Sequence, residues 1–507
     1  MSRQKSSVNN LIWGIIGNVI TTLIAIIIPR LFIVNYGSEI NGFLSSIKQI
    51  YVYLALLEAG IGDASVVALY GPIAKGQIDD CNKILAATHY YYKRIGVLYG
   101  LLIIALGLIY PLFLDTTLPY LTCFLIIVLQ GSGNVISYMF QGKYNMLLRV
   151  DNRNYVTTNL GTVTSTATDI IRIILLLNGR SIIAVQSIYL IFNVVKMLYI
   201  SYYIKKHYKW INLKVKPNFT AVSRNKSVFT HQISSLIFSQ TDVLILTFVC
   251  GLKTVSLYSI YATVFGMIDN IVTIVSNSVQ SALGQIYNSD KNKYLKLQEA
   301  FEVYYLALVF ALFDVTLVLI LPFVSLYTAG ADMNYVNLKL AILFCVCRLL
   351  NYGRVSSGQI IGFEGAYKDT QWRAILESVI NLVVSFICVF TLGIYGVLIG
   401  TAVALLYRAN DMIIYANHKL LHRSAKPTYR RWLTNIIVFI ITVFAFYKLK
   451  TNINSYLTFF INAIWITPAS FIIFVGVNTI IEKDARKTAA EYIVPALKSI
   501  RNKLKIR

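Results

Sequence analysis

Basic side chains stand where the sequence predicts membrane-spanning helices, and these residues are the best placed to do chemistry. A charge at bilayer depth is costly and is usually retained because it faces a partner or a cavity on a substrate path. Arg30 and Lys48 are predicted at a similar depth in the first two helices, and Arg348 and Arg354 follow in a later one. Arginine suits phosphate because its planar fork donates two hydrogen bonds at once. We therefore predict these four residues to bind an anion such as a diphosphate. The alternative is structural ion pairing or snorkelling to the interface.

Acidic side chains in the predicted helices are candidates for ion coupling. A carboxylic acid inside the membrane can carry a proton or bind sodium. The candidates have no basic residue one turn away on the same helix; they are Glu58, Asp63, Asp242, Asp269 and Asp314. A structural pair of Asp314 with Arg348 is the alternative for that acid. Three further pairs have helical spacing and are predicted to be structural: Asp169 with Arg172, Arg408 with Asp411, and Arg373 with Glu377.

Tyrosine is abundant, with 35 residues against 26 phenylalanines. A tyrosine ring can stack on a sugar face while its hydroxyl forms hydrogen bonds, and interface belts or helix packing are the alternative. The tyrosines considered as sugar contacts are Tyr51, Tyr138, Tyr258, Tyr261 and Tyr352.

Motifs of catalysis and metal binding are missing from the sequence. There is no Walker A motif, so ATP is not expected as the direct energy source. The five histidines form no metal motif, and the six cysteines have neither zinc nor redox spacing. We therefore predict no enzyme, no catalytic residue, no metal site and no cofactor beyond a coupling proton or sodium ion.

The composition indicates that a bilayer surrounds the elements that position these residues. Of 507 residues, 57% are hydrophobic and 13% are charged, about half the charged fraction of a soluble domain. A spanning helix needs about 20 residues. We predict an all-α polytopic membrane protein with fourteen helices, at 10–36, 41–70, 84–114, 117–141, 154–178, 181–204, 226–250, 254–286, 296–328, 334–363, 370–392, 394–417, 432–449 and 456–481. The first is interpreted as a retained helix and not a signal peptide.

The net charge of +24 reflects topology and not nucleic-acid binding. Once the predicted helices are placed, Lys and Arg gather in the segments on one side, and the other side has only Arg180, Lys253, Lys448 and Lys450. This asymmetry predicts that both termini are cytoplasmic.

Glycine and proline positions suggest an internal repeat. Tyr36-Gly37 and Cys250-Gly251 end the first and seventh predicted helices, and Tyr110-Pro111 and Leu321-Pro322 end the third and ninth. We predict a six-helix lobe at 1–204, a basic cytoplasmic connection at 205–225, a second six-helix lobe at 226–417, and two further helices with a basic tail at 418–507. Two lobes of this kind would enclose a cavity and rock to give alternating access.

One stretch near the start resembles a known family. The run Pro29-Arg30-Leu-Phe-Ile-Val-Asn-Tyr36-Gly37-Ser-Glu-Ile-Asn-Gly42-Phe43, followed by Leu56-Leu-Glu58-Ala-Gly60-Ile-Gly62, resembles the polysaccharide transporter family. Its members are flippases for O-antigen, capsule and exopolysaccharide repeat units. They belong to the multidrug/oligosaccharidyl-lipid/polysaccharide (MOP) exporter superfamily.

The resemblance implies a function and a location. It implies a MATE-like architecture in the bacterial cytoplasmic membrane, with an undecaprenyl-diphosphate-linked oligosaccharide moved from the inner to the outer leaflet. It also implies a polysaccharide polymerase and glycosyltransferases as partners, and it matches Arg30 to the family's basic residue before Tyr-Gly. The alternatives are a cation-coupled multidrug or metabolite exporter of the same fold, a polytopic glycosyltransferase, and a scaffolding protein.

Overall fold

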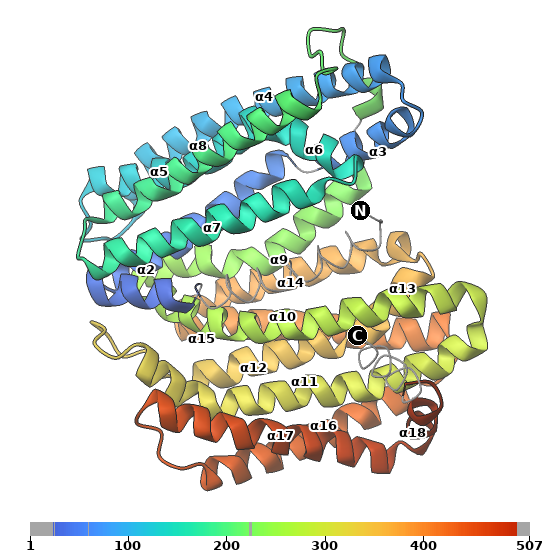
Figure 1. Ribbon diagram of the computed structural model, residues 1–507. Helices are drawn as coiled ribbons and strands as arrows, with labels where there is room; N and C mark the ends of the chain where they lie inside the picture. Colours follow the sequence, from blue (N-terminus) through green and yellow to red (C-terminus); the bar gives the residue numbers. More distant parts are fainter. Residues whose placement is uncertain (1–23, 25, 59, 223–225, 494–507) are drawn as a thin grey trace, which may run out of the picture. The chain divides into compact units, whose positions relative to one another are not determined.

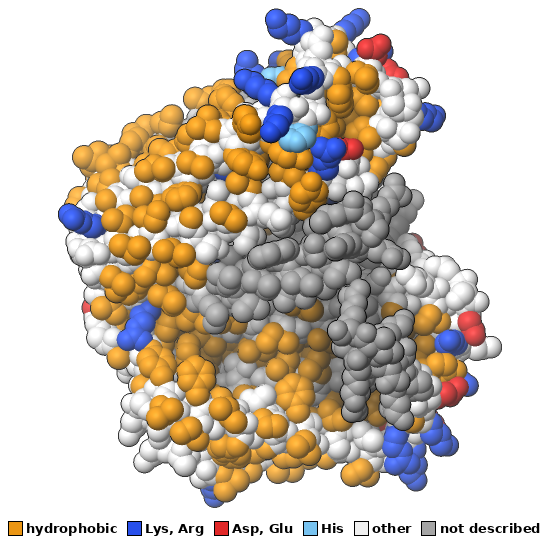
Figure 2. Space-filling view, viewed as in Figure 1, with side chains coloured by type: hydrophobic (Ala, Val, Ile, Leu, Met, Phe, Trp, Pro, Cys, Tyr) orange, Lys and Arg blue, Asp and Glu red, His pale blue; other side chains and the backbone are white. Residues whose placement is uncertain are grey.

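The computed structural model describes residue 24 and residues 26–58, 60–222 and 226–493. Throughout these residues the regular structure is helical. Eleven helices of the described part are long and apolar enough to cross a membrane. Hydrophobic side chains cover much of the face of the molecule seen in Figure 2, while most of the visible Lys and Arg side chains lie toward its edges. The prediction of an all-α polytopic membrane protein is confirmed.

Two compact units make up the chain. Unit 1 comprises Met1–Ser259 and Gly330–Met333, and unit 2 comprises Ile260–Ala329 and Asn334–Arg507. The predicted six-helix repeat stays a prediction.

The helices of unit 1 differ widely in length (Figure 1). They are Ile26–Tyr36, α2 (Ser38–Leu54), α3 (Ile61–Ala74), α4 (Ile78–Ile109), α5 (Tyr120–Ile136), α6 (Gly142–Val150), α7 (Asn154–Leu177), α8 (Ile182–His207), α9 (Lys226–Cys250) and the first turns of α10 (Leu252–Ser289). Helices α4, α5 and α8 lie side by side, and α7 packs on α8.

Unit 2 is arranged around α11. It contains the rest of α10, α11 (Lys291–Tyr327), α12 (Leu338–Gly353), α13 (Val355–Phe363), α14 (Tyr367–Leu392), α15 (Ile394–Ile414), α16 (Lys426–Leu449), α17 (Tyr456–Ile481) and α18 (Lys483–Thr488). Helix α11 contacts α12, α16, α17 and α18. It is also the most buried of the spanning helices, which makes it the core of the unit.

Short polar side chains set several helix starts. Asp290 Oδ1 accepts a hydrogen bond from the Lys293 N–H at 2.9 Å, and Asn337 Oδ1 accepts one from the Leu340 N–H at 3.0 Å. These caps satisfy N–H groups that have no partner inside the helix. Ser455 and Thr458 form a reciprocal capping box at the start of α17.

The start of α2 is capped from a distant loop. The Ser38 N–H donates to Asp332 Oδ1 at 2.9 Å, and Lys253 Nζ lies 3.9 Å from Asp332 Oδ2. A carboxylate is favoured at a helix N-terminus. Burial alone would raise the pKa of Asp332, but the hydrogen bonds from Ser38 and the charge of Lys253 hold that pKa below its usual value.

Eleven of the fourteen predicted spans correspond to long apolar helices. The other three correspond to the shorter segments Ile26–Tyr36, Gln240–Cys250 and the interrupted pair α12–α13. Residues 10–23 and 25 of the first predicted helix lie outside the described residues.

Two predicted continuous helices are wrong. The helix predicted at 41–70 is divided, because α2 passes into a 3-10 turn at Ala55–Leu57 and Gly60 has a φ of +84°. Only glycine adopts that conformation at little cost. The helix predicted at 334–363 breaks at Arg354, directly after Gly353, where a Cβ would overlap the ring of Trp432.

A buried charge cluster joins α16 and the end of α17 to α11. Arg431 Nη1 lies 3.0 Å from Glu302 Oε1, and its Nη2 lies 3.2 Å from Glu482 Oε2. These three residues are 8% exposed or less, and the Thr428 hydroxyl also donates to Glu302 at 2.8 Å. Removing one partner of a buried pair leaves an uncompensated charge, which is strongly destabilising.

We expect Arg431→Met to lower the free energy of unfolding by about 3–5 kcal/mol. The matched control is Arg430→Met, because Arg430 pairs with the same Glu482 but its side chain is 61% exposed. An exposed pair contributes about 0–1 kcal/mol. Thermal unfolding of both variants in detergent measures the difference, and equal losses would contradict the buried cluster's role.

Close helix packing yields a second prediction. A Cβ on Gly400 of α15 would lie 2.5 Å from the backbone nitrogen of Ser385 on α14, whereas one on Gly476 of α17 would meet no atom within 4 Å. Overpacking costs about 1–3 kcal/mol. We therefore expect Gly400→Val, but not Gly476→Val, to lower the melting temperature in detergent. A shift of similar size in both variants would show that the α14–α15 contact is not tight.

Candidate functional site

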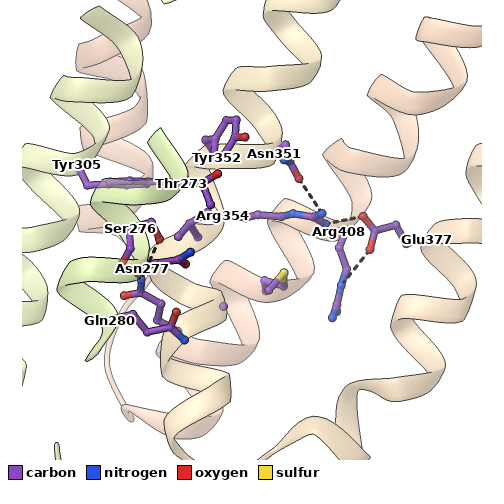
Figure 3. Close-up of a pocket in the computed structure, with 14 residues that line it drawn as sticks. Thr273, Ser276, Asn277, Gln280, Tyr305, Asn351, Tyr352, Arg354, Glu377 and Arg408 are labelled. Carbon is purple, nitrogen blue, oxygen red and sulfur yellow. Dashed lines mark hydrogen bonds and ion pairs between the residues drawn. The ribbon is translucent and has the colours of Figure 1, made fainter. Parts of the chain in front are cut away.

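A polar pocket of about 430 Å³ lies in unit 2 (Figure 3). Side chains from six helices, α10 to α15, line it. Most of these helices are apolar enough to span a membrane. Polar side chains inside a bilayer cost free energy and are usually retained because they have a partner or a function.

One wall of the pocket is charged. Glu377 of α14 lies between two arginines, with its Oε1 2.5 Å from Arg354 Nη1 and its Oε2 3.5 Å from Arg408 Nε. Arg354 Nη2 also donates to Asn351 Oδ1 at 3.0 Å, as the dashed lines in Figure 3 show. Glu377 and Arg408 are each 7% exposed. This wall therefore holds two fixed guanidinium groups around one carboxylate.

The charge network continues behind the pocket. Arg408 Nη1 lies 2.6 Å from Asp411 Oδ2, and Asp411 Oδ1 lies 2.5 Å from Arg373 Nη1. Together with Arg354 and Glu377, this network of ion pairs contains three arginines and two carboxylates. Its excess of one positive charge favours an anionic ligand beside Arg354.

The opposite wall carries neutral hydrogen-bonding groups. Thr273, Ser276, Asn277 and Gln280 are spaced to share one face of α10, and all four line the pocket. Figure 3 shows the Ser276, Asn277 and Gln280 side chains on one side, Arg408 and Glu377 on the other, and Arg354 between them.

One buried amide and two phenols extend this neutral wall. Gln359 Nε2 donates to Ser276 Oγ at 3.2 Å, while its buried Oε1 has no hydrogen-bond partner among the described residues. The rings of Tyr305 and Tyr352 complete the lining, and Tyr352 stacks on Phe313 with centroids 6.0 Å apart. Amide, hydroxyl and aromatic groups together suit a ligand rich in hydroxyls.

The four predicted binding residues are distributed over both units. Arg30 is half-buried in Ile26–Tyr36, and Lys48 is exposed on α2. In unit 2, Arg354 lines the pocket, whereas Arg348 Nε pairs with Asp269 Oδ2 at 2.9 Å. The structure thus brings one of the four to the pocket and gives another a counter-ion.

The predicted coupling acids have varied surroundings. The Tyr92 hydroxyl donates to Glu58 at 2.5 Å, and Asp63 is an exposed partner of Arg149 at 3.1 Å. Asp242 is 6% exposed and accepts a hydrogen bond from Tyr258 at 3.0 Å.

Asp314 lies in the centre of unit 2 and is fully buried. It accepts hydrogen bonds from Thr442 at 2.8 Å and Ser470 at 2.7 Å. Within the described residues no Lys or Arg side chain lies within 4.0 Å of it, so the expected alternative pair with Arg348 is wrong. Arg348 pairs with Asp269 instead, because α10 brings that acid closer.

Two predicted local pairs are confirmed and one is wrong. Asp169 pairs with Arg172 at 3.3 Å, and Arg408 with Asp411 at 2.6 Å. Arg373 and Glu377 do not pair, because each finds a better partner on a neighbouring helix: Asp411 for Arg373, and Arg354 for Glu377.

Of the five tyrosines considered for sugar stacking, Tyr352 lines the pocket. The others support packing. Tyr51 donates to the Ile127 carbonyl at 2.5 Å, Tyr138 contacts the Tyr99 ring, Tyr258 donates to Asp242, and Tyr261 donates to the Tyr335 carbonyl.

Sequence reasoning missed most of the neutral wall. The signal was present, since Thr273, Ser276, Asn277 and Gln280 form one polar stripe on an otherwise apolar helix. It also missed Gly396 and Gly400, a small-xxx-small pair through which α15 approaches α14. Among the described residues there is no group of three or more side chains suited to a metal ion.

The fold matches known transporters although the sequence does not match known families. No protein-family model and no curated protein sequence matches the chain. Lipid II flippase MurJ in an inward closed conformation has a TM-score of 0.72 at 16% sequence identity, over 92% of this chain and 99% of MurJ. An inward-facing multidrug resistance MATE family transporter of the MOP superfamily has a TM-score of 0.59 at 15% identity, over 78% and 94%. A MOP superfamily transporter from Pyrococcus furiosus has a TM-score of 0.50 at 15% identity, over 80% and 94%. The chain therefore has a MOP-like fold.

The charged wall makes a testable prediction about stability. We expect Glu377→Gln to lower the melting temperature in detergent, because Arg354 and Arg408 then share less negative charge. An uncompensated buried charge costs about 3–5 kcal/mol. Adding Arg354→Gln should restore part of the loss, so a double-mutant cycle should give a coupling of about 0.5–3 kcal/mol. Additive losses would show that the two residues do not act as a pair.

Proposed function

We propose that this chain is a flippase that moves an undecaprenyl-diphosphate-linked oligosaccharide from the inner to the outer leaflet of the bacterial cytoplasmic membrane. The observation that carries the proposal is the unit 2 pocket, where fixed arginines face a wall of amides and hydroxyls inside a membrane-spanning fold. Such a ligand combines phosphate charge with sugar hydroxyls, and the two walls match those two parts.

The charged wall is suited to the diphosphate. Transfer of a phosphate out of water is costly unless hydrogen bonds and opposite charge replace the lost hydration. Arg354 is held by Glu377 and Asn351, so its guanidinium is oriented before a ligand arrives. A preoriented donor loses less side-chain entropy on binding.

The neutral wall is suited to the sugars. The Asn277 and Gln280 amides on α10 can both donate and accept, as sugar hydroxyls do. The pocket volume of about 430 Å³ is within the range of small-ligand sites and would hold part of a headgroup.

The fold supports movement of a lipid-linked cargo. MurJ, whose fold this chain shares, is described as a lipid II flippase. In the proposed cycle the headgroup enters from the cytoplasmic side, the lipid tail stays in the bilayer, and the pocket then opens to the outside by alternating access.

Further residues have proposed roles in this cycle. Arg30, Lys48 and Arg348 are proposed as additional contacts for the anionic headgroup. The acids Glu58, Asp63, Asp242, Asp269 and Asp314 are proposed carriers of a coupling proton or sodium ion. Both termini are proposed to be cytoplasmic, with glycosyltransferases acting before transport and a polymerase acting after it.

A second candidate is a cation-coupled multidrug or metabolite exporter. The MATE transporter fold is also similar, with a TM-score of 0.59. Asp314 favours this reading, since a fully buried carboxylate without a basic neighbour in the described residues could pair with a cation. The charged wall weighs against it, because arginines repel cationic cargo.

The function is tested by deleting the gene and analysing lipid-linked oligosaccharides by mass spectrometry. We expect a complete repeat unit to accumulate on undecaprenyl diphosphate, with loss of surface polymer. Complementation with Arg354→Gln or Arg30→Gln should restore export at least about tenfold less well than wild type, since a hydrogen bond to a charged group contributes about 1.5–3 kcal/mol.

Arg430→Gln is the matched control and should complement fully, because its side chain is 61% exposed and lines no part of the pocket. Membrane levels of each variant are measured alongside. Unchanged lipid intermediates in the deletion strain would reject the flippase and favour the exporter.

A further inference from the structure

A groove on the surface of unit 1 follows the middle of α4. Two hollows of about 420 and 440 Å³ adjoin there and share Arg94 and Leu98. The first is completed by Tyr90, Lys93, Val97 and Leu101. The second is completed by Ile95 and by Tyr53, Leu54, Leu56 and Leu57, where α2 passes into its 3-10 turn.

The polar end of this groove is cationic. The Arg94 guanidinium lies 4.3 Å from the centre of the Tyr90 ring, which orients it by a cation–π contact. Tyr90 is supported edge-on by Phe219 at 5.2 Å. Lys93 and Arg94 are both exposed, and in the described structure no carboxylate lies within 4.0 Å of either. This differs from the pocket of unit 2, where each arginine of the charged wall is paired with a carboxylate.

Apart from the two cations, the lining of both hollows is mostly apolar, and exposed apolar side chains continue it along α4. Val97, Leu98, Leu101, Ile104 and Leu108 continue the same side of α4, and each is between 46% and 61% exposed. At about 1.5 Å per residue, the rise from Val97 to Leu108 is roughly 16 Å, close to half of the bilayer's hydrocarbon thickness of about 30 Å. A cation at one end of an apolar stripe that is as long as one leaflet is deep is complementary to a single anionic phospholipid, in charge and in length.

We propose that this groove binds an anionic phospholipid, with its phosphate on Arg94 and Lys93 and an acyl chain along Val97 to Leu108. Two adjacent cations favour a lipid with net negative charge over a zwitterionic one. The site lies in unit 1 and uses none of the pocket residues, so it does not depend on the proposed transport function.

The test is native mass spectrometry of the delipidated full-length chain with phosphatidylglycerol or phosphatidylcholine of equal chain length. Wild type should retain phosphatidylglycerol preferentially. Because each cation near a membrane surface contributes about a five-fold preference, Lys93→Gln with Arg94→Gln should lower that retention by at least about ten-fold. The matched control, Lys205→Gln with Lys206→Gln, removes two exposed cations from the end of α8, where Lys206 also lies over a tyrosine ring but lines neither hollow.

Hydrogen exchange of wild type provides a readout that needs no variant. Phosphatidylglycerol, but not phosphatidylcholine, should slow exchange in the part of α4 around Arg94. Equal retention of both lipids, equal loss in the control variant, or no protection of α4 would overturn the proposal. Displacement of phosphatidylglycerol by an equimolar polyprenyl phosphate would also overturn it, and would assign the groove to the carrier lipid.

Discussion

A carboxylate or guanidinium inside an apolar helix bundle needs a counter-charge or hydrogen-bonding groups from the protein itself, and unit 2 is organised by this requirement. Glu302, Arg431 and Glu482 join α11 to α16 and to the end of α17, and Asp314 accepts hydroxyl hydrogen bonds from the same two helices. Buried ion pairs are not efficient sources of stability, but breaking one is costly. Here they specify register, because each pair fixes the position of one helix along its neighbour.

The same requirement shapes the pocket. Arg354 stands at the break between α12 and α13, which turns its side chain toward α14 and α15. Glu377 and Asn351 then fix the guanidinium, while the neutral side chains of α10 face it across the pocket. A charged ligand would thus meet groups whose orientation was settled during folding, which lowers the side-chain entropy lost on binding.

The sequence predicted the helical class and most spans because apolar length is a local property. It also predicted the pairs Asp169–Arg172 and Arg408–Asp411, whose partners are one helical turn apart. It did not predict Arg348–Asp269 or Arg354–Glu377, because these depend on which helices become neighbours and at what register. Helix breaks were missed for a related reason. Gly60 and Gly353 are not distinguished from other glycines in the sequence. The break at Gly60 goes with its positive φ, and the close contact of Gly353 with the Trp432 ring depends on how the helices pack.

The polar stripe of α10 has an evolutionary consequence. Its four residues project from one face of a single helix, and the arginine network belongs to other helices. Substitutions among Thr, Ser, Asn and Gln on this face would alter the pattern of hydrogen-bond donors and acceptors on this wall without disturbing a buried charge. Under the proposed function, cargo preference would therefore change by point mutation while the arginine network and the fold stayed intact, so that relatives exporting different sugars would share one architecture.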